Sequence, residues 1–135
     1  MYIKYIGDIF GGGRNGMLCR AYVDAIATEH NLYVVPTTMN NSAQYDKYTR
    51  MVTEKGNYRV VIHHINPSNI TIEKGKVNIG IVDCKTTTIP EPWRRSLYSL
   101  DYILTSSVHS MRAVSLVKNI PETILVSPPH PLTSN

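Results

Sequence analysis

Apolar and polar positions follow two different periods along this chain, and each period predicts a type of element. In residues 1–10, MYIKYIGDIF, apolar Ile3 and Tyr5 flank polar Lys4, which is the alternation of a strand. The next apolar positions recur at spacings of three and four, the period of a helix packed on a sheet. These positions are Met17, Leu18, Ala21, Tyr22, Ala25 and Ile26. The apolar run LYVVPTT at 32–38 then predicts a second, short strand.

The rest of the chain continues to alternate between the two periods. Helices are predicted at 43–56, 90–100 and 107–119, and strands at 58–65, 77–82, 101–106 and 122–127. The segment 71–84, TIEKGKVNIGIVDC, allows a hairpin through Gly75 or a loop followed by a buried strand at 77–82, which we favour. Strands that alternate with helices predict an α/β fold. We expect a single Rossmann-like three-layer domain with a mostly parallel sheet over residues 1–127, followed by a proline-rich tail at 128–135.

Composition and charge narrow the class of protein. Apolar residues make up 42% and charged residues 18% of the 135, which indicates a globular rather than a disordered chain. The net charge of +4 is scattered, so a nucleic-acid partner is not expected, and a basic face for an anionic ligand explains the charge as well. Neither a signal peptide nor a membrane-spanning segment is recognisable, which predicts a cytoplasmic protein. Cys19 and Cys84 have no metal-binding spacing and are predicted to be buried and free.

The first candidate site is the glycine loop, residues 11–16, GGGRNG, between the first strand and the first helix. Its spacing matches neither the dinucleotide fingerprint GxGxxG nor a Walker A loop. A helix N-terminus favours an anion, and missing side chains let a ligand approach the backbone. We therefore predict that five residues of the loop bind substrate: Gly11, Gly12, Gly13, Arg14 and Asn15. A tight strand-to-helix turn without a ligand is the alternative. In the helix that follows, Arg20 and Asp24 are spaced for a weak ion pair.

Two further groups follow the ends of other predicted strands, and ligands of open parallel sheets bind at that edge. His63 and His64 are the candidate catalytic residues, but neighbours in a strand point to opposite faces, so only one can face a given cleft. The alternative is a satisfied residue at the edge of the sheet beside an exposed one. Thr86 and Thr87 could bind a polyol, or merely satisfy the local backbone. No third ligand has metal-site spacing and no GxSxG elbow is present, so neither a metal site nor a serine hydrolase is predicted.

The order of these pieces resembles a known family. FGGGRNG, HHINP, NIG before a threonine-rich turn, IPEPW and LDYILTSS occur in the order of the N-terminal domain of retaining B-type glycosyltransferases, the glycosyltransferase group 1 or glycogen-synthase-like branch. The resemblance runs over nearly the whole chain. It implies two Rossmann-like domains that face each other across a cleft, with the N-terminal domain binding the acceptor and its glycine loop near the donor diphosphate.

Carried over residue by residue, the resemblance assigns roles to several positions. Gly12, Gly13 and Arg14 would face the cleft, and His63 or His64 would contact the donor sugar. Asp101 and Ser107 would match the family's aspartate and serine where a strand leads into a helix. The tail at 128–135 would lie where a linker to a donor domain starts.

The expected function is therefore the acceptor-side half of a glycosyltransferase. It would transfer a sugar from a nucleotide-sugar donor to an unidentified acceptor, without a further cofactor. The donor-binding half would come from a separate donor-domain protein or from a homo-oligomer, so activity of this chain alone stays open. The alternative is a noncatalytic Rossmann-like module with a binding or regulatory role.

Overall fold

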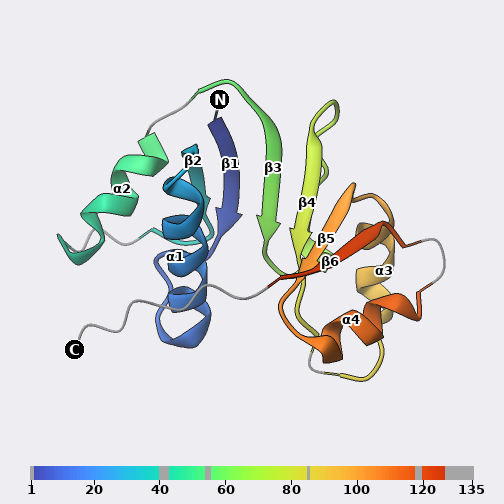
Figure 1. Ribbon diagram of the computed structural model, residues 1–135. Helices are drawn as coiled ribbons and strands as arrows, with labels where there is room; N and C mark the ends of the chain where they lie inside the picture. Colours follow the sequence, from blue (N-terminus) through green and yellow to red (C-terminus); the bar gives the residue numbers. More distant parts are fainter. Residues whose placement is uncertain (1, 40–42, 54–55, 85, 118–119, 127–135) are drawn as a thin grey trace. The chain divides into compact units, whose positions relative to one another are not determined.

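Six strands and four α-helices alternate along the chain in the computed structural model, which describes residues 2–39, 43–53, 56–84, 86–117 and 120–126. The strands are β1 (Tyr2–Gly7), β2 (Asn31–Pro36), β3 (Tyr58–His64), β4 (Val77–Ile81), β5 (Tyr102–Thr105) and β6 (Glu122–Leu125). The helices are α1 (Gly13–Ala27), α2 (Asp46–Thr53), α3 (Glu91–Tyr98) and α4 (Val108–Ser115). The sheet order is β2-β1-β3-β4-β5-β6, with parallel strands (Figure 1). The predicted Rossmann-like α/β fold is thus confirmed.

The described residues form two compact units, 2–61 and 62–126, and the boundary falls within β3. In the first unit β1 and β2 pair in parallel from Tyr2 opposite Asn31 to Gly7 opposite Pro36. α1 connects these two strands, as expected for a βαβ crossover. The apolar interior of this unit includes the fully buried Tyr5, Val23 and Val34.

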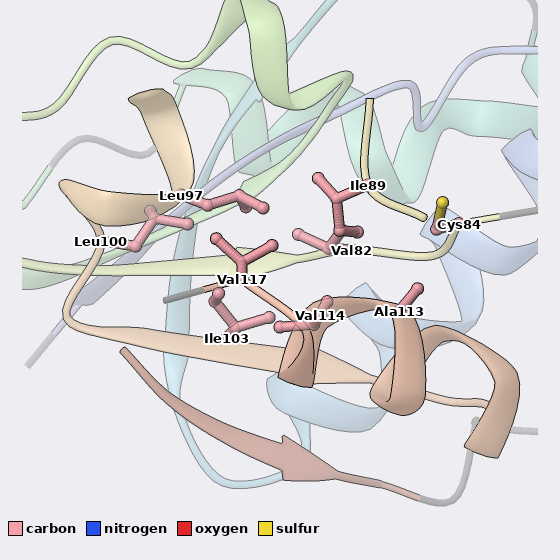
Figure 2. Packing of buried hydrophobic residues seen from close by; sticks show 9 residues of the cluster. All are labelled: Val82, Cys84, Ile89, Leu97, Leu100, Ile103, Ala113, Val114 and Val117. Atoms are coloured by element: carbon pink, nitrogen blue, oxygen red, sulfur yellow. The ribbon is translucent and has the colours of Figure 1, made fainter. Parts of the chain in front are cut away.

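The second unit has its own apolar core, which Figure 2 shows from close by. Its members come from the segment after β4, from α3 and the turn after it, from β5, and from α4 and the residues after it. They are Val82, Cys84, Ile89, Leu97, Leu100, Ile103, Ala113, Val114 and Val117. Trp93 packs against this cluster and is only partly buried. Both cysteines are buried and free, as predicted.

Two helix starts need correction, and the favoured prediction for residues 71–84 is confirmed. α1 begins at Gly13, inside the glycine stretch, whereas the apolar period starts only at Met17. The loop followed by a strand, which we favoured for 71–84, is confirmed, because the chain turns at Gly75 (φ 81°) and enters β4 as a single strand. The helix predicted from residue 43 starts as a short 3-10 helix, Ala43–Tyr45, before α2. The proline-rich tail lies outside the described residues.

Within the part of the chain that the structure describes, no helix combines the length and the apolar character needed to cross a bilayer.

Candidate functional site

The glycine loop of the first unit follows β1 through Asp8, and two of its glycines are required by packing. The backbone N–H of Gly11 donates to the carbonyl of Asp8 (3.2 Å), which closes a turn. A side chain on Gly11 would collide with the Asp8 carboxylate. A side chain on Gly16 would collide with the carbonyl of Gly11, so the first turn of α1 lies against the loop backbone. The interpretation as a tight turn therefore accounts for Gly11 and Gly16.

Gly12 and Gly13 have open space around them instead. A Cβ atom built on either residue has no described neighbour within 4 Å. Gly13 has φ +71°, a conformation that favours glycine. Gly12 is extended (φ −79°, ψ 171°), and any residue adopts that conformation. Neither crowding nor backbone conformation therefore explains the glycine at position 12.

The first turn of α1 is electropositive. Gly12 occupies the N-cap position, no side chain of the described residues caps the turn, and the turn contains no acidic residue. Arg14 and Asn15 are both exposed there. A cation in the first turn of a helix is unfavourable next to the positive end of the helix dipole. The first N–H groups of a helix have no partner within the helix, and here they lie beside a guanidinium, which is the arrangement that attracts an anion.

Arg20 holds the glycine loop through hydrogen bonds to its backbone. Its Nη1 donates to the carbonyls of Ile9 (2.8 Å) and Gly11 (2.9 Å), and its guanidinium lies 5.0 Å from the centre of the Tyr45 ring. The ion pair expected between Arg20 and Asp24 is replaced by these contacts, because the guanidinium reaches two carbonyl acceptors at once.

Asp24 has other partners in the same unit. Its carboxylate pairs with Lys47 (3.0 Å) and accepts the hydroxyl proton of Tyr48 (3.0 Å). Both partners come from α2, so Asp24 ties α1 to α2 rather than serving the loop.

Asp8 is a residue of this region that the sequence analysis missed. Its Oδ1 accepts hydrogen bonds from the hydroxyls of Thr37 (3.1 Å) and Thr38 (3.5 Å), which follow β2. Asp8 thus joins the carboxyl ends of β1 and β2. An aspartate directly after one strand and a threonine pair after the next was the available sequence signal.

In the second unit, His63 is fully buried and belongs to a structural network. Its Nε2 lies 2.9 Å from Oδ1 of Asn78. The Asn78 amide nitrogen donates to the carbonyls of Glu73 (3.0 Å) and Lys76 (3.1 Å), so its oxygen faces His63 and Nε2 of His63 carries the proton. Nδ1 of His63 is buried without a hydrogen-bond partner among the described residues. His63 therefore holds the turn before β4 and presents no atom at the surface.

Asp101 and Ser107, which the family resemblance singled out, also bond to nearby backbone. Asp101 Oδ2 accepts from the Asn78 N–H (2.7 Å), and the Asp101 N–H donates to the Asn78 carbonyl (2.8 Å). Ser107 is the N-cap of α4 and accepts from the N–H of Ser110 (3.0 Å). These contacts position the start of β4 and the start of α4.

His64 points to the other face of β3 and is partly exposed. Burial lowers its pKa to about 4, and the negative charge of Asp83 opposes part of that shift. The imidazole is therefore neutral near pH 7. The prediction that the two histidines differ in environment agrees with these positions, and His64 is the one that reaches the surface.

Asp83 follows β4 and repeats the arrangement of Asp8. Its Oδ1 accepts from the Ser106 hydroxyl (3.0 Å), the Ser106 N–H (3.3 Å) and the Thr105 hydroxyl (3.4 Å) at the end of β5. Asp83 was not among the site residues predicted from the sequence. The available signal was again an aspartate after one strand, IVD, and hydroxyl residues after the next, LTSS.

Thr86 and Thr87, which follow β4, are both exposed, and Thr86 also bonds to nearby backbone. The Thr86 hydroxyl donates to the carbonyl of Thr88 (2.6 Å), and its own carbonyl lies 2.9 Å from Nε2 of His109. Thr86 therefore satisfies the local backbone, one of the two alternatives predicted for it. Thr87 is exposed.

The predicted site residues thus lie in two groups, one in each unit. Gly11 to Asn15 form one stretch at the start of α1, while His64 ends β3 and the threonines follow β4. No group of three or more metal-ligating side chains comes together among the described residues. Comparisons with protein-family models, with curated proteins and with solved structures found no match to this chain.

Proposed function

We propose that this chain is the acceptor-side half of a glycosyltransferase, and that its glycine loop binds the diphosphate of a nucleotide-sugar donor. One observation supports diphosphate binding. The N-cap residue of α1, Gly12, makes no side-chain cap, the first turn contains no acidic residue, and no side chain at Gly12 covers the N–H groups of this turn. Such N–H groups at the positive end of a helix dipole bind phosphate oxygens. The transfer of a sugar is supported by the resemblance in the order of motifs.

The local charges support an anionic ligand. Arg14 is exposed in the first turn, and the guanidinium of Arg20 bonds to the loop carbonyls of Ile9 and Gly11. Asp8 adds a negative charge beside Gly11, but two threonine hydroxyls already bond to it. The two guanidiniums outweigh this one carboxylate.

A donor-binding partner belongs to the same proposal. Met17 is 42% exposed near the start of α1, and a docking surface beside the loop would cover such an apolar side chain. The partner would be a separate donor-domain protein or a second copy of this chain. It would supply the groups that bind the nucleoside and stabilise the leaving diphosphate.

Calorimetric titration of the full chain with UDP and with ADP tests the binding step. Gly12→Val keeps an allowed backbone and its Cβ meets no described neighbour within 4 Å, so it should leave the fold intact and abolish diphosphate binding. Gly13→Ala and Gly75→Ala form a matched pair, because both glycines have positive φ and open surroundings and only Gly13 lies in the loop. Their stabilities should fall by similar amounts, about 1 kcal/mol each, and only Gly13→Ala should weaken binding.

The outcome separates the binding step from catalysis. Equal diphosphate affinity in wild type and Gly12→Val would refute a role of the loop in binding. A second outcome is that the chain binds diphosphate but releases no nucleoside diphosphate above background with any donor-domain partner. The chain would then be a noncatalytic binding module.

A further inference from the structure

The strand order ends at β6, and no other strand of the described residues pairs with the outer edge of β6 (Figure 1). The N–H of Val126 donates to the carbonyl of Thr105 (2.8 Å), so the backbone groups of Val126 and of every second residue before it face β5. Because these groups alternate in direction along a strand, those of Thr123 and Leu125 point away from β5. An edge strand with unpaired N–H and C=O groups is a template for a further strand.

The strand at the other end of the order, β2, is protected in a way that β6 is not. β2 ends in Pro36, and α2 packs against it. β6 contains no proline, and its side chains Ile124 and Leu125 are 42% and 45% exposed. An apolar edge strand that is exposed to this extent favours pairing with another chain.

The register of the strands places three apolar side chains in one row across β4, β5 and β6. Ile81 lies opposite Leu104, and Leu104 lies opposite Ile124. Successive side chains of a strand point to opposite faces, so this row lies on the face of β5 that does not carry Ile103 of the core. Ile81 is buried, Leu104 is half-buried and Ile124 is exposed. The row therefore ends at the outer edge of β6 with its most exposed member.

We propose that β6 pairs with β6 of a second copy of this chain, antiparallel, about a two-fold axis at Ile124. Ile124 of one copy then lies opposite Ile124 of the other, and the two apolar rows join into one. This register uses both outward residues, because the backbone of Thr123 bonds to that of Leu125 across the axis. Glu122 lies opposite Val126, so no like charges come together. This self-complementarity selects a second copy as the partner, and it does not depend on the proposed function.

Analytical ultracentrifugation of the full chain from about 10 µM to about 1 mM tests the pairing, because small interfaces have weak affinities. We expect a monomer–dimer equilibrium that depends on concentration. Ile124→Lys places two ammonium groups opposite each other and should weaken the dimer by about tenfold or more. Leu116→Lys is the matched control, since Leu116 is 72% exposed in the same unit but lies outside β6. It should dimerise like wild type.

Oxidative cross-linking of cysteine variants locates the interface. Residues that face each other in an antiparallel pair without mutual hydrogen bonds have Cα atoms about 4.5 Å apart, which suits a disulfide. Ile124→Cys should therefore form a covalent dimer in air, whereas Leu116→Cys should not. Cys19 and Cys84 are buried and do not compete.

Three results would overturn the proposal: a monomer at every concentration, a dimer that Ile124→Lys leaves intact, or equal cross-linking of Ile124→Cys and Leu116→Cys. If the amide spectrum shows that Ile124→Lys does not fold, Leu125→Pro takes its place. It removes an outward N–H that bonds only to the second copy, and it should weaken the dimer severalfold. Diphosphate binding at the glycine loop without dimerisation would refute this pairing alone, and dimerisation without diphosphate binding would uphold the pairing and refute the proposed function.

Discussion

Protonation of His64 should destabilise the folded chain in mild acid, and the size of the effect follows from its surroundings. Burial lowers the pKa of His64 from its ordinary 6.5 to about 4, against the opposing charge of Asp83. Because the unfolded chain binds this proton more tightly than the folded chain, stability rises with pH across that window. The contribution of His64 to the free energy of unfolding is constant above about pH 7.5 and falls as the pH drops from 6.5 to 4.

The expected loss follows from the size of the shift. One pKa unit corresponds to about 1.4 kcal/mol, so a shift from 6.5 to about 4 gives a loss of at most about 3.5 kcal/mol. Since the side chain is partly exposed, solvent screening reduces this, and we expect about 2 kcal/mol. That is a large fraction of the stability of a small domain.

Urea unfolding of wild type and His64→Gln at a series of pH values measures the effect. The free energy of unfolding of wild type should fall more steeply below pH 6.5 than that of His64→Gln, and the two slopes should agree above pH 7.5. Asp83→Asn removes the charge that favours protonation, so it should lower the pKa of His64 below about 4, measured by imidazole proton shifts. Parallel curves for wild type and His64→Gln would refute the assigned environment of His64.

Three other substitutions test the contacts described above, each by urea unfolding. Gly16→Ala should destabilise by about 1–3 kcal/mol, because its methyl group collides with the Gly11 carbonyl; a neutral effect would contradict the close approach of loop and helix. Asn78→Ala should cost about 3 kcal/mol or more, because it leaves the His63 N–H and other buried groups unpaired. Leu97→Ala should cost about 2–5 kcal/mol through the cavity it leaves in the second core, and a smaller loss would mean that the core collapses around the gap.

The alternation of elements was predictable because periods of two and of three to four residues are local properties of the sequence. The start of α1 was not predictable, because glycine has a low helix propensity and the apolar stripe begins only at Met17. At position 16 the close approach of the Gly11 carbonyl leaves no room for a side chain, a contact that the apolar period does not reveal.

In the candidate sites, too, local features were predictable from the sequence and contacts between distant residues were not. That His63 and His64 point to opposite faces followed from the strand period. Which of them is buried depends on Asn78, 15 residues further along, and the sequence did not reveal this pairing. Asp8 and Asp83 were missed because their partners follow neighbouring strands, and only the sheet order brings those strand ends together.

Amide chemical shifts of the full chain during titration with UDP test the central claim most directly, because they report on each N–H group at the start of α1. We predict saturable shifts of the amides from Gly12 to Asn15 in wild type, and their loss in Gly12→Val while the rest of the spectrum is retained. Unchanged amides at Gly12 to Asn15, or shifts that persist in Gly12→Val, would contradict the assignment of the glycine loop as a diphosphate site.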